Sequence, residues 1–586
     1  MNNYALNKPG TEENKSLWSS IKKMLPLLRE QKRRIIIATV AAFATSGLNL
    51  LAPILIGHAV DDYIQKGQYH GVLVYSAIIF GIYIGAVITS YFQTLLMGRV
   101  GQNVLFALRN SVFNTLGSLP VAFFNQNKAG DLISRINNDT DKLNQFFSQS
   151  LVQFFANIIT IIGAAIFMLA VNWKIGLVAI IPALFLLGFT RILSPWIKHK
   201  NALSLKNIGG LSAEVSESID NFKVVVAFDR RDYFKEKFKE VNEINYKSAI
   251  SAGIANNTLT PTYGLASGIA QLSVIAYSIT LISSGQFTLG LLISFLTYIT
   301  RMYDPLRQMA TVWSSFQIAF ASWDRIHAIL VLDSDLIHVS ETKALSSAHV
   351  MEFKNVSFSY PGGKEVLHSV NFAFDHGKTY ALVGPTGGGK TTTASLIARL
   401  YDPSEGVVLL DGRDIRSYDD SARAKKIGFI LQEPFLFSGT VHENILYGNE
   451  EYSNLTNEEL EKIIHDHGLE KLLERFDDRL DTAVTATGNG LSLGQKQLIA
   501  FIRAALRRPE LIILDEATAN IDTVTEQLLE DILKKLPKET TLVIIAHRLN
   551  TIENADEIFF VNSGEVARAG SMQQAVDMLL HGKRQS

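Results

Sequence analysis

The chain of 586 residues is long enough for several domains, and its hydrophobic content of 47% favours a membrane protein. A formal net charge of −1 gives no reason to expect a nucleic-acid-binding surface. The sequence contains no cysteine, which excludes disulfides, thiolate zinc sites and a cysteine nucleophile.

The composition changes near residue 330 and indicates two domains joined by a linker. Residues 1–330 carry long apolar runs, whereas residues 350–586 have the pattern of a soluble α/β domain. The stretch between them, 331–349, is short, polar and without periodicity, which is typical of a linker.

The N-terminal stretch does not have the pattern of a signal peptide. Its apolar content stays low until Ile35, and the apolar run that follows is too long for a signal sequence. Residues 17–28 have amphipathic spacing and are accompanied by lysines and arginines. This predicts a helix on the cytoplasmic membrane surface, with a frayed basic tail as the alternative.

Six runs have the length and apolar content of a membrane-spanning helix, which needs about 20 mostly apolar residues. They lie at roughly 35–59, 72–97, 147–172, 175–196, 256–283 and 287–320. The fifth run contains Asn256, Asn257 and Pro261. Because such polarity is costly against lipid, we expect this span to face other helices or a wet cavity.

The distribution of lysine and arginine orients these spans. The segments before the first span, between the second and third, and between the fourth and fifth are rich in basic residues. The alternate connections, such as 172–174 and 283–286, are short and nearly free of them. The positive-inside rule therefore predicts that both termini and the α/β domain are cytoplasmic.

The two long cytoplasmic connections have apolar residues at a spacing near 3.6, which predicts helical extensions of the spans. Residues 130–140 and 217–225 are their most distinctive stretches.

Four ionisable residues of the spans are candidates for function. Arg301 and Asp304 share one face of the sixth span, where they either take part in function or neutralise each other. Asp61 and Asp62 fall at the outer end of the first span, as gate contacts or as marks of the membrane exit.

A phosphate-binding loop is the most informative motif of the α/β domain. The sequence GPTGGGKT at 384–391 follows a strand-like run, 379–383, and opens a helix-like run, 392–398. Its glycines let backbone N–H groups close around phosphates, and the helix N-terminus adds partial positive charge. The loop predicts bound ATP, with Lys390 reaching the β- and γ-phosphates and the Thr391 hydroxyl holding Mg²⁺. The expected ligands of ATP in this loop are Gly384, Thr386, Gly387, Gly388, Gly389, Lys390, Thr391 and Thr392.

Further motifs follow in order along this domain. They are a strand pattern ending at Tyr360, FILQEP at 429–434, LSLGQKQ at 491–497, LIILDE at 511–516, and LVIIAHR at 542–548. This series, with the six spans before it, resembles the half-transporters of the ABC exporter family over nearly the whole chain. The resemblance implies an all-α transmembrane domain of six helices with long intracellular helices, followed by an α/β P-loop nucleotide-binding domain.

The resemblance also implies a role for each motif. Residues 130–140 and 217–225 lie where the family has its coupling helices. Tyr360 would stack on adenine, and Gln432 and Asp515 would join Thr391 around Mg²⁺. Gln432 would also contact the attacking water, which Glu516 would activate as general base, while His547 would contact the γ-phosphate. Ser492, Gly494 and Gln495 would bind the ATP held by a second subunit, so the ATP sites require a dimer.

Two positions depart from the family pattern. Leu493 stands where the signature usually has glycine, and the acid that often precedes the signature is missing from 485–490. Asp515, Glu516 and His547 are intact. This combination resembles the chain of heterodimeric exporters that keeps the catalytic glutamate, and it implies a different partner chain with a normal signature. A homodimer that tolerates Leu493 is the alternative.

The function implied by the resemblance is ATP-driven export of hydrophobic or amphiphilic small molecules by alternating access, in contact with membrane lipid. The expected location is the cell (inner) membrane. Lipid flipping and peptide export are alternatives of the same fold. A nucleotide-gated regulator that transports nothing is disfavoured by Glu516 and His547, and a soluble DNA-repair ATPase is excluded by the spans.

Overall fold

The computed structural model describes residues 4–6, 24, 26, 28–340, 347–449, 451–485, 490–515, 521–545, 555–569, 573, 574 and 578. They belong to two compact units. The helical unit falls within residues 9–116 and 130–331, and the α/β unit falls within residues 1–8, 117–129 and 332–586. The predicted surface helix at 17–28 lies almost entirely outside the described residues.

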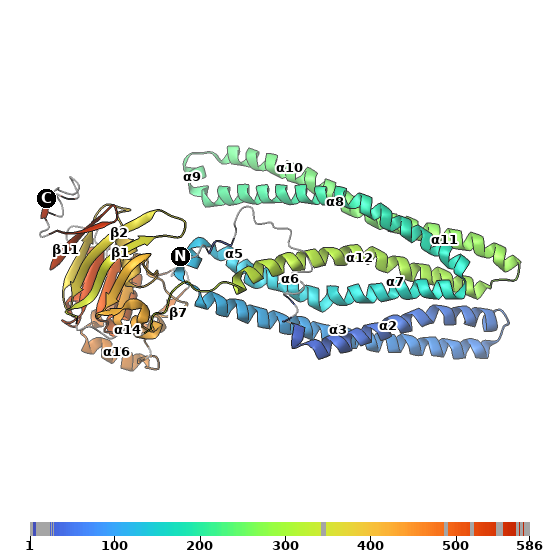
Figure 1. The fold of residues 1–586 in the computed structure, drawn as a ribbon, viewed down its shortest axis with the longest axis horizontal. Coiled ribbons are helices and arrows are strands. Elements are labelled where there is room, and N and C mark those ends of the chain that lie inside the picture. Colours follow the sequence, from blue (N-terminus) through green and yellow to red (C-terminus); the bar gives the residue numbers. More distant parts are fainter. Residues whose placement is uncertain are drawn as a thin grey trace. The chain divides into compact units, whose positions relative to one another are not determined.

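The helical unit consists of long helices that run beside one another (Figure 1). They are α2 (Lys32–Ala59), α3 (Tyr69–Ser118), α5 (Ala129–Ser134), α6 (Thr140–Gln145), α7 (Leu151–Val171), α8 (Trp173–Asp220), α9 (Phe222–Ala227), α10 (Arg231–Asn257), α11 (Leu259–Ser283) and α12 (Leu289–Leu330). Short π-helical segments, η1 (Val60–Ile64), η2 (Arg135–Asp139) and η3 (Phe146–Ser150), extend three of these helices. The two long connections predicted to be cytoplasmic are helical, as their periodicity predicts.

Five helical stretches of the described chain are long and apolar enough to cross a membrane. They are Lys32–Ile64, Tyr69–Ser118, Ala129–Val171, Trp173–Asp220 and Arg231–Ser283. The sixth predicted span forms α12, which is not among the five. Charged and hydroxyl-bearing residues interrupt its apolar sequence between Thr297 and Asp304, so α12 is the polar member of the bundle.

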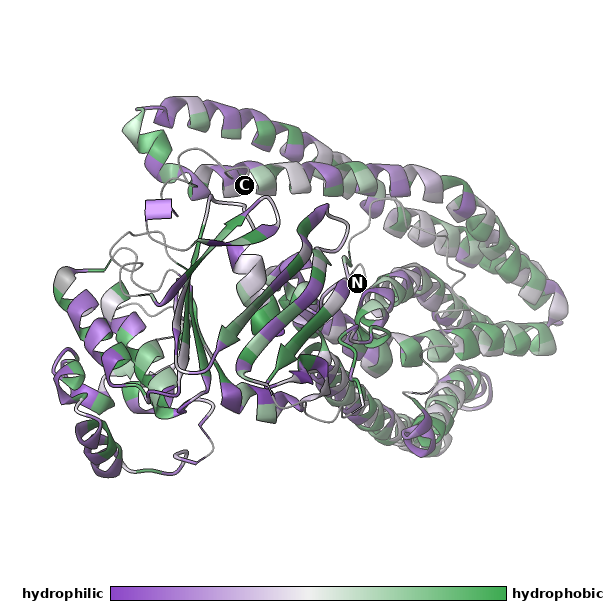
Figure 2. Ribbon diagram, turned by 60° about the vertical axis from the view of Figure 1, so that its left-hand side comes forward, coloured by the Kyte–Doolittle hydropathy of each residue, from purple (hydrophilic) through white to green (hydrophobic). Residues whose placement is uncertain are grey.

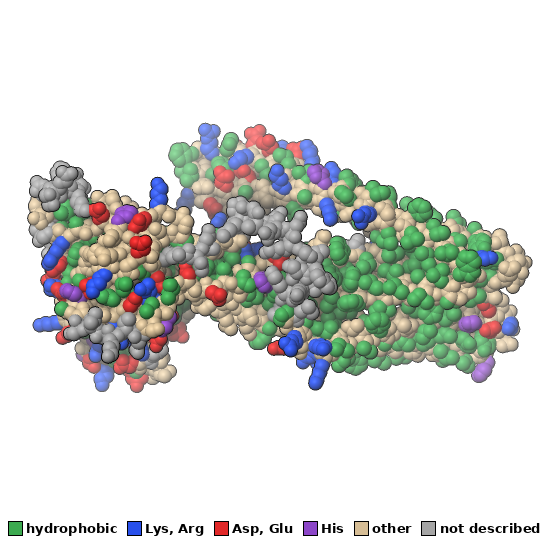
Figure 3. Space-filling view, viewed as in Figure 1, with side chains coloured by type: hydrophobic (Ala, Val, Ile, Leu, Met, Phe, Trp, Pro, Cys, Tyr) green, Lys and Arg blue, Asp and Glu red, His purple; other side chains and the backbone are tan. Residues whose placement is uncertain are grey.

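Hydrophobic and charged side chains occupy different parts of the surface of the helical unit along its length (Figure 3). Hydrophobic side chains cover the part that holds α11, and charged side chains gather around α9 and the adjoining ends of α8 and α10. An apolar belt beside charged ends is what a membrane protein needs, because the belt meets lipid and the ends meet water.

Buried hydroxyl groups join α12 to the helices around it. Tyr298 donates a hydrogen bond to the Leu50 carbonyl of α2 at 2.6 Å, and Tyr303 donates to the Ala179 carbonyl of α8 at 3.1 Å. Each bond pairs a donor that would otherwise be costly to bury. These bonds fix the face of α12 that carries Tyr298 and Tyr303 against α2 and α8.

The α/β unit is built on three sheets. The four-stranded sheet has the order β2 (Glu365–Asp375), β1 (His349–Ser359), β4 (Glu405–Leu410) and β5 (Arg413–Asp414). The six-stranded sheet has the order β12 (Glu565–Ala569), β11 (Glu557–Asn562), β3 (Thr379–Val383), β10 (Thr541–Ile545), β9 (Leu511–Asp515) and β6 (Ile427–Ile430). The small third sheet pairs β7 (Gly439–Thr440) with β8 (Ala483–Val484).

Helices pack around these sheets and complete the core. They are α4 (Val121–Gln126), α13 (Lys390–Ile397), α14 (Asp420–Lys426), α15 (Val441–Leu446), α16 (Asn457–Asp466), α17 (Glu470–Leu473), α18 (Leu493–Leu506) and α19 (Thr523–Lys534). Hydrophobic residues concentrate along the strands (Figure 2). β9 is buried at every position, as a parallel strand covered on both faces must be. The predicted architecture, a helical membrane domain followed by an α/β domain, is confirmed.

Candidate nucleotide site

The phosphate-binding loop follows β3 and leads directly into α13. β3 pairs in parallel with β10 and β11, so the loop leaves the sheet at the carboxyl edge of these strands. Gly384 has a φ of +149°, and a Cβ at this position would lie 1.9 Å from the carbonyl oxygen of Val561. Only glycine fits here, because any side chain would collide with that backbone.

Lys390 is the first residue of α13 and is only 5% exposed. Its Nζ donates hydrogen bonds to the carbonyl oxygens of Gly384 at 2.8 Å and Pro385 at 3.0 Å. These bonds hold the ammonium group against the start of the loop. A positive charge there adds to the partial charge of the α13 N-terminus, and both favour a bound phosphate.

The two threonines after Lys390 differ in their surroundings. Thr391 is exposed in the first turn of α13, whereas Thr392 is buried. The hydroxyl groups of Thr392 and Tyr360 are hydrogen-bonded at 3.1 Å. Thr391 is thus accessible to a metal ion, while the side chain of Thr392 is engaged inside the unit and its role as an ATP ligand stays a prediction.

Tyr360 follows β1 and is half-buried between two other rings. Its ring centre lies 4.9 Å from that of Phe358 and 5.3 Å from that of Tyr401, both in edge-on geometry. Burial raises the pKa of Tyr360, although the hydrogen bond with Thr392 acts in the opposite direction. The phenol is therefore neutral and fixed in orientation, and the predicted stacking on adenine stays a prediction.

The predicted catalytic acids follow a strand that ends beside the loop. Asp515 is the last residue of β9, is 9% exposed, and pairs in register with Ile545, the last residue of β10. Because β10 also pairs with β3, Asp515 lies at the same sheet edge as the phosphate-binding loop. Glu516 and His547 lie outside the described residues.

Gln432 lies just after β6 with its side chain exposed. Its backbone carbonyl accepts a hydrogen bond of 2.8 Å from Nε2 of Gln497, which is fully buried on α18. The signature helix therefore holds the loop that carries Gln432. Gln497 lies within the predicted signature motif, but nothing in the sequence indicated that its side chain would bond to the backbone of Gln432.

The signature residues form the start of α18. The Ser492 hydroxyl accepts a hydrogen bond from the Gln495 backbone N–H at 3.2 Å, and the Gln495 side chain accepts one from the Ser492 N–H at 2.7 Å. This reciprocal cap satisfies two backbone donors of the first turn. At Gly494 an added Cβ would lie 3.0 Å from the side chain of Thr525 on α19, so the glycine permits close packing of the two helices.

Leu493, the residue that departs from the family pattern, is the first residue of α18 and half-buried. Its φ is not positive, so the backbone of the helix start does not require glycine at this position. Leucine at this position therefore does not strain the backbone of α18. It changes the surface that a ligand or a second subunit would meet at the start of the helix.

Asp522 is the cap residue directly before α19. Its carboxylate accepts hydrogen bonds from the Thr525 hydroxyl at 2.6 Å and the Thr525 N–H at 3.0 Å. These two hydrogen bonds lower the pKa of Asp522.

In the long connection between the second and third predicted spans, α4 belongs to the α/β unit, whereas residues 130–140 do not. Asn125 of α4 donates a hydrogen bond of 2.8 Å to the hydroxyl of Tyr401, whose ring contacts Tyr360. A short chain of contacts thus joins α4 to the phosphate-binding helix. Sequence reasoning missed Asn125 and Tyr401, because neither lies in a recognised motif.

Arg301 and Asp304 do not form an ion pair, so the alternative that they neutralise each other does not hold in this structure. The nearest cationic partner of Asp304 is Arg307, at 4.0 Å, and no carboxylate of the described chain pairs with Arg301. Asp61 accepts hydrogen bonds from the Thr288 hydroxyl at 2.5 Å and the Gly290 N–H at 2.7 Å, so it caps the start of α12. Asp62 is exposed beside Lys66 at 3.7 Å.

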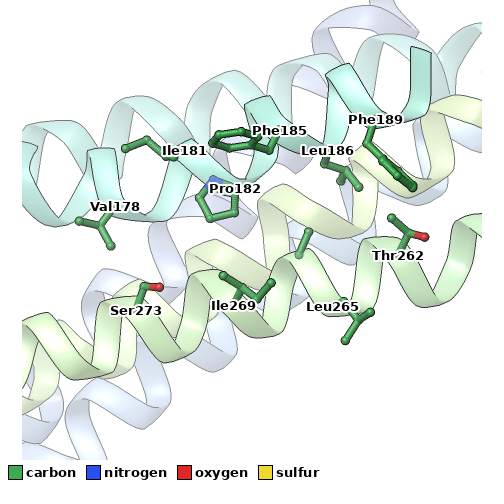
Figure 4. Close-up of a pocket in the computed structure, with 11 residues that line it drawn as sticks. Val178, Ile181, Pro182, Phe185, Leu186, Phe189, Thr262, Leu265, Ile269 and Ser273 are labelled. Carbon is green, nitrogen blue, oxygen red and sulfur yellow. The ribbon is translucent and has the colours of Figure 1, made fainter. Parts of the chain in front are cut away.

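A groove of about 610 Å³ lies between α8 and α11 in the helical unit (Figure 4). Pro182 and Phe185 of α8 and Ile269 of α11 are among the side chains that line it. Thr262 and Ser273 are its only polar side chains in the described structure. The groove is suited to an apolar ligand, because it offers dispersion contacts and few hydrogen bonds.

Comparison with known proteins identifies both halves. Residues 35–306 match the ABC transporter transmembrane region, and residues 367–519 match the ABC transporter family. An uncharacterised ABC transporter ATP-binding protein of Bacillus subtilis (strain 168) is 32% identical over 95% of this chain and 92% of its own length. A multidrug resistance ABC transporter ATP-binding and permease protein of Lactococcus lactis subsp. cremoris (strain MG1363) is 30% identical over 95% and 94%. A fatty acid ABC transporter ATP-binding/permease protein of Mycobacterium bovis is 27% identical over 97% and 96%.

These matches extend over the membrane helices and the nucleotide site alike, and they agree with the order of motifs in the α/β unit. The loop at 384–391 lies within the segment that matches the ABC transporter family, on the same polypeptide as the membrane helices. The chain belongs to the ABC transporters, as a half-transporter of the exporter type that couples ATP hydrolysis to transport.

Proposed function

We propose that this chain exports hydrophobic or amphiphilic small molecules of the multidrug type, as one half of a heterodimer that works by alternating access. The apolar groove between α8 and α11 is the observation that supports this substrate class, because its lining favours molecules that partition into membranes. The Lactococcus relative, named as a multidrug resistance transporter, supports it as well. Lipid export is a second candidate, favoured by the fatty acid transporter among the relatives.

ATP would be held between this chain's phosphate-binding loop and a second subunit. Lys390 would neutralise phosphate oxygens, and Tyr360 would contact the adenine. The exposed hydroxyl of Thr391, the carboxylate of Asp515 and the side-chain oxygen of Gln432 come from three segments of this site. They fit Mg²⁺, which prefers oxygen ligands and would neutralise charge on the phosphate oxygens when bound.

Glu516 would remove a proton from the attacking water, and His547 would contact the γ-phosphate. Closure of the two nucleotide sites would move the coupling helices and open the membrane cavity outward, and hydrolysis would reset it. The work comes from the different affinity of ATP for the two states. We place the complex in the cell (inner) membrane as a multi-pass protein, with both termini in the cytoplasm.

The heterodimer proposal rests on Leu493 and on the start of α18. The side chains of Ser492 and Gln495 hydrogen-bond within this chain, and a leucine lies where the approaching phosphate would need a close contact with the backbone. This signature would therefore close a site that holds ATP without fast turnover. α9 and the residue that follows it offer exposed apolar side chains for contact with a second subunit: Phe222 is 58% exposed and Phe228 is 74% exposed.

The test of the proposed function uses the purified complex in lipid vesicles. Replacing Glu516 with Gln is expected to lower ATP hydrolysis and ATP-dependent uptake of an amphiphilic dye by about 10² to 10⁴-fold, the usual contribution of a general base. Glu530→Gln, on the exposed face of α19, is the matched control and should leave both rates unchanged. Turnover by Glu516→Gln near the rate of the unmodified complex would show that hydrolysis takes place at another site.

A further inference from the structure

One face of α12 is polar although the helix lies among membrane spans. Thr297, Thr300, Arg301 and Asp304 share this face, because their spacing of three and four residues follows the helical turn. The opposite face, with Tyr298, Met302 and Tyr303, is buried in the apolar core of the helical unit. The polar face is therefore not needed for packing within this core.

These polar residues are expected to lie near the middle of the membrane's hydrocarbon core. Arg301 comes twelve residues after the first residue of α12, and Gln271 comes twelve residues before the last residue of α11. At 1.5 Å per residue each lies about 18 Å from the short connection that joins the two helices. The hydrocarbon core of a membrane is about 30 Å thick, so both residues are near its middle.

A pocket of about 510 Å³ brings these residues together. It is lined by Gln271 of α11 and by Ile293, Leu296, Thr297, Thr300, Arg301 and Asp304 of α12. We call it the Arg301 pocket. The hydroxyls of Thr297 and Thr300 donate to carbonyl oxygens of their own helix, at 3.0 and 3.2 Å, which leaves their oxygen atoms turned toward the backbone.

The pocket holds one arginine and one carboxylate, but the two do not form an ion pair with each other. Arg301 is half-buried, and its Nε is buried with no hydrogen-bond partner. Asp304, one turn further along α12, lies 4.0 Å from Arg307 and is 59% exposed. Two arginines therefore share one carboxylate on this stretch of α12, and the guanidinium of Arg301 is the group that lacks an anion among the described residues.

Ionisable residues at membrane depth mark substrate pathways and face a wet cavity or a partner. A guanidinium offers N–H donors in a planar fork that suits carboxylate and phosphate groups. The residues on the side of the pocket toward the start of α12, Ile293 and Leu296, are apolar. The pocket thus combines a site for one anion with an apolar wall beside it.

We propose that the Arg301 pocket binds the anionic headgroup of an amphiphile, a carboxylate or a phosphate, with the apolar tail lying along Ile293 and Leu296. This inference rests on the proposed export function and narrows its substrate class to amphiphiles that carry a negative charge. Arg301 would be the residue that selects the charge.

The test compares three probes with the same oleyl chain: oleate, oleoyl lysophosphatidate and oleyl alcohol. The purified complex in phosphatidylcholine nanodiscs is titrated with each, and the half-maximal concentration is read from ATPase stimulation and, without ATP, from equilibrium dialysis. The two anions are expected to act at concentrations about tenfold or more below that of the alcohol. Whichever anion binds tighter identifies the carboxylate or the phosphate as the preferred headgroup.

Three variants test whether Arg301 is the residue that causes the preference for anionic probes. Arg301→Gln should raise the half-maximal concentration of the anions about tenfold, to that of the alcohol, and leave the alcohol unchanged. Arg301→Lys should keep a preference for anions. Arg191→Gln, which removes an exposed arginine of α8 outside the pocket, should behave as the unmodified complex.

Three results would overturn the proposal: no preference for anions, an equal loss for anions and alcohol in Arg301→Gln, or no preference in Arg301→Lys. The last two would make Arg301 a structural residue or a partner of the second subunit. ATP-dependent uptake of a neutral dye by the same complex separates the two claims. If uptake persists while the anion preference is absent, the export function stands and only this inference fails.

Discussion

At the scale of single residues, the nucleotide site depends on side chains that lie outside the phosphate-binding motifs. Thr392 is hydrogen-bonded to Tyr360, the Tyr360 ring contacts Tyr401, and Tyr401 accepts a hydrogen bond from Asn125. Gln497 supports the carbonyl of Gln432 from a fully buried position. The motifs supply the groups that we propose as ligands of ATP, and these supporting residues fix the positions of Tyr360 and of the segment that carries Gln432.

Asp375, the last residue of β2, makes the stability of the α/β unit depend on pH. Its carboxylate accepts hydrogen bonds from Lys378 at 2.7 Å and lies 2.6 Å from Nδ1 of His349. The bond from Lys378 is the main reason that the pKa of Asp375 is lowered, and the contact with His349 adds to it. A lowered pKa in the folded state means that this stabilisation is present above the unfolded pKa of about 3.9 and is lost as the pH falls through the folded value.

We expect the thermal stability of the complex to fall on acidification below about pH 4 in part through this group. Asp375→Asn should lower stability at pH 7 and show a weaker loss between pH 5 and pH 3, as measured by thermal unfolding in detergent. Glu405→Gln, at the start of β4, is the control for removal of one carboxylate. Equal pH profiles for Asp375→Asn and the unmodified complex would contradict the assignment.

The sequence was sufficient to single out expected ligands of ATP but not the residues that support them. Glycines, a lysine and a threonine at fixed spacing between a strand and a helix have few other uses, so Lys390 and Thr391 could be proposed as ligands, and this role stays a prediction. Asn125 and Tyr401 are far apart in the chain and of common types, and only the folded unit shows that they are hydrogen-bonded. The spacing of Arg301 and Asp304 left open whether they neutralise each other or take part in function, and only the structure shows that Asp304 lies toward Arg307 instead.

At the scale of elements, the long connection between the second and third predicted spans contributes to both units of the chain. α4 belongs to the α/β unit, whereas residues 130–140 form α5 and η2 within the helical unit. There they make a buried ionic network with α12. Arg325 of α12 lies 2.7 Å from Asp131 and 3.2 Å from Asp139, and Arg135 pairs with Asp131 at 2.9 Å. The polar residues that made this stretch distinctive in the sequence therefore serve helix packing.

Asp139 is the member of this network with the least access to water, at 1% exposure of its side chain. Asp139→Ala would leave Arg325 and the fully buried Arg135 with too few anions, and we expect a cost of about 3 to 5 kcal/mol. Asp141→Ala is the matched control, since Asp141 is 59% exposed in its pair with Arg109 and should cost about 1 kcal/mol or less. Thermal unfolding of the two purified variants tests the difference, and equal melting temperatures would show that the network is not what holds α5 and η2 to α12.

At the scale of the whole molecule, the chain carries one phosphate-binding loop and one signature, so a complete transporter needs two nucleotide-binding domains. We expect native mass spectrometry of the gently extracted, tagged chain to show a complex with a second, different chain of similar mass. That partner should have glycine at the position of Leu493 and lack the glutamate that corresponds to Glu516. A complex of two copies of this chain would contradict the heterodimer, and both ATP sites would then have to work with Leu493.

The α/β unit is assembled from segments that lie far apart along the sequence, and Tyr4 belongs to one of them. Tyr4 is 2% exposed, its ring lies 6.2 Å from that of Phe123 in α4, and its hydroxyl is hydrogen-bonded to the backbone of Asp333 and Asp335. During translation the segment around Tyr4 is made before the strands of its unit, which emerge only after residues 9–116 and 130–331 of the helical unit. The contacts that Tyr4 makes with residues 333 and 335 can therefore form only late in assembly.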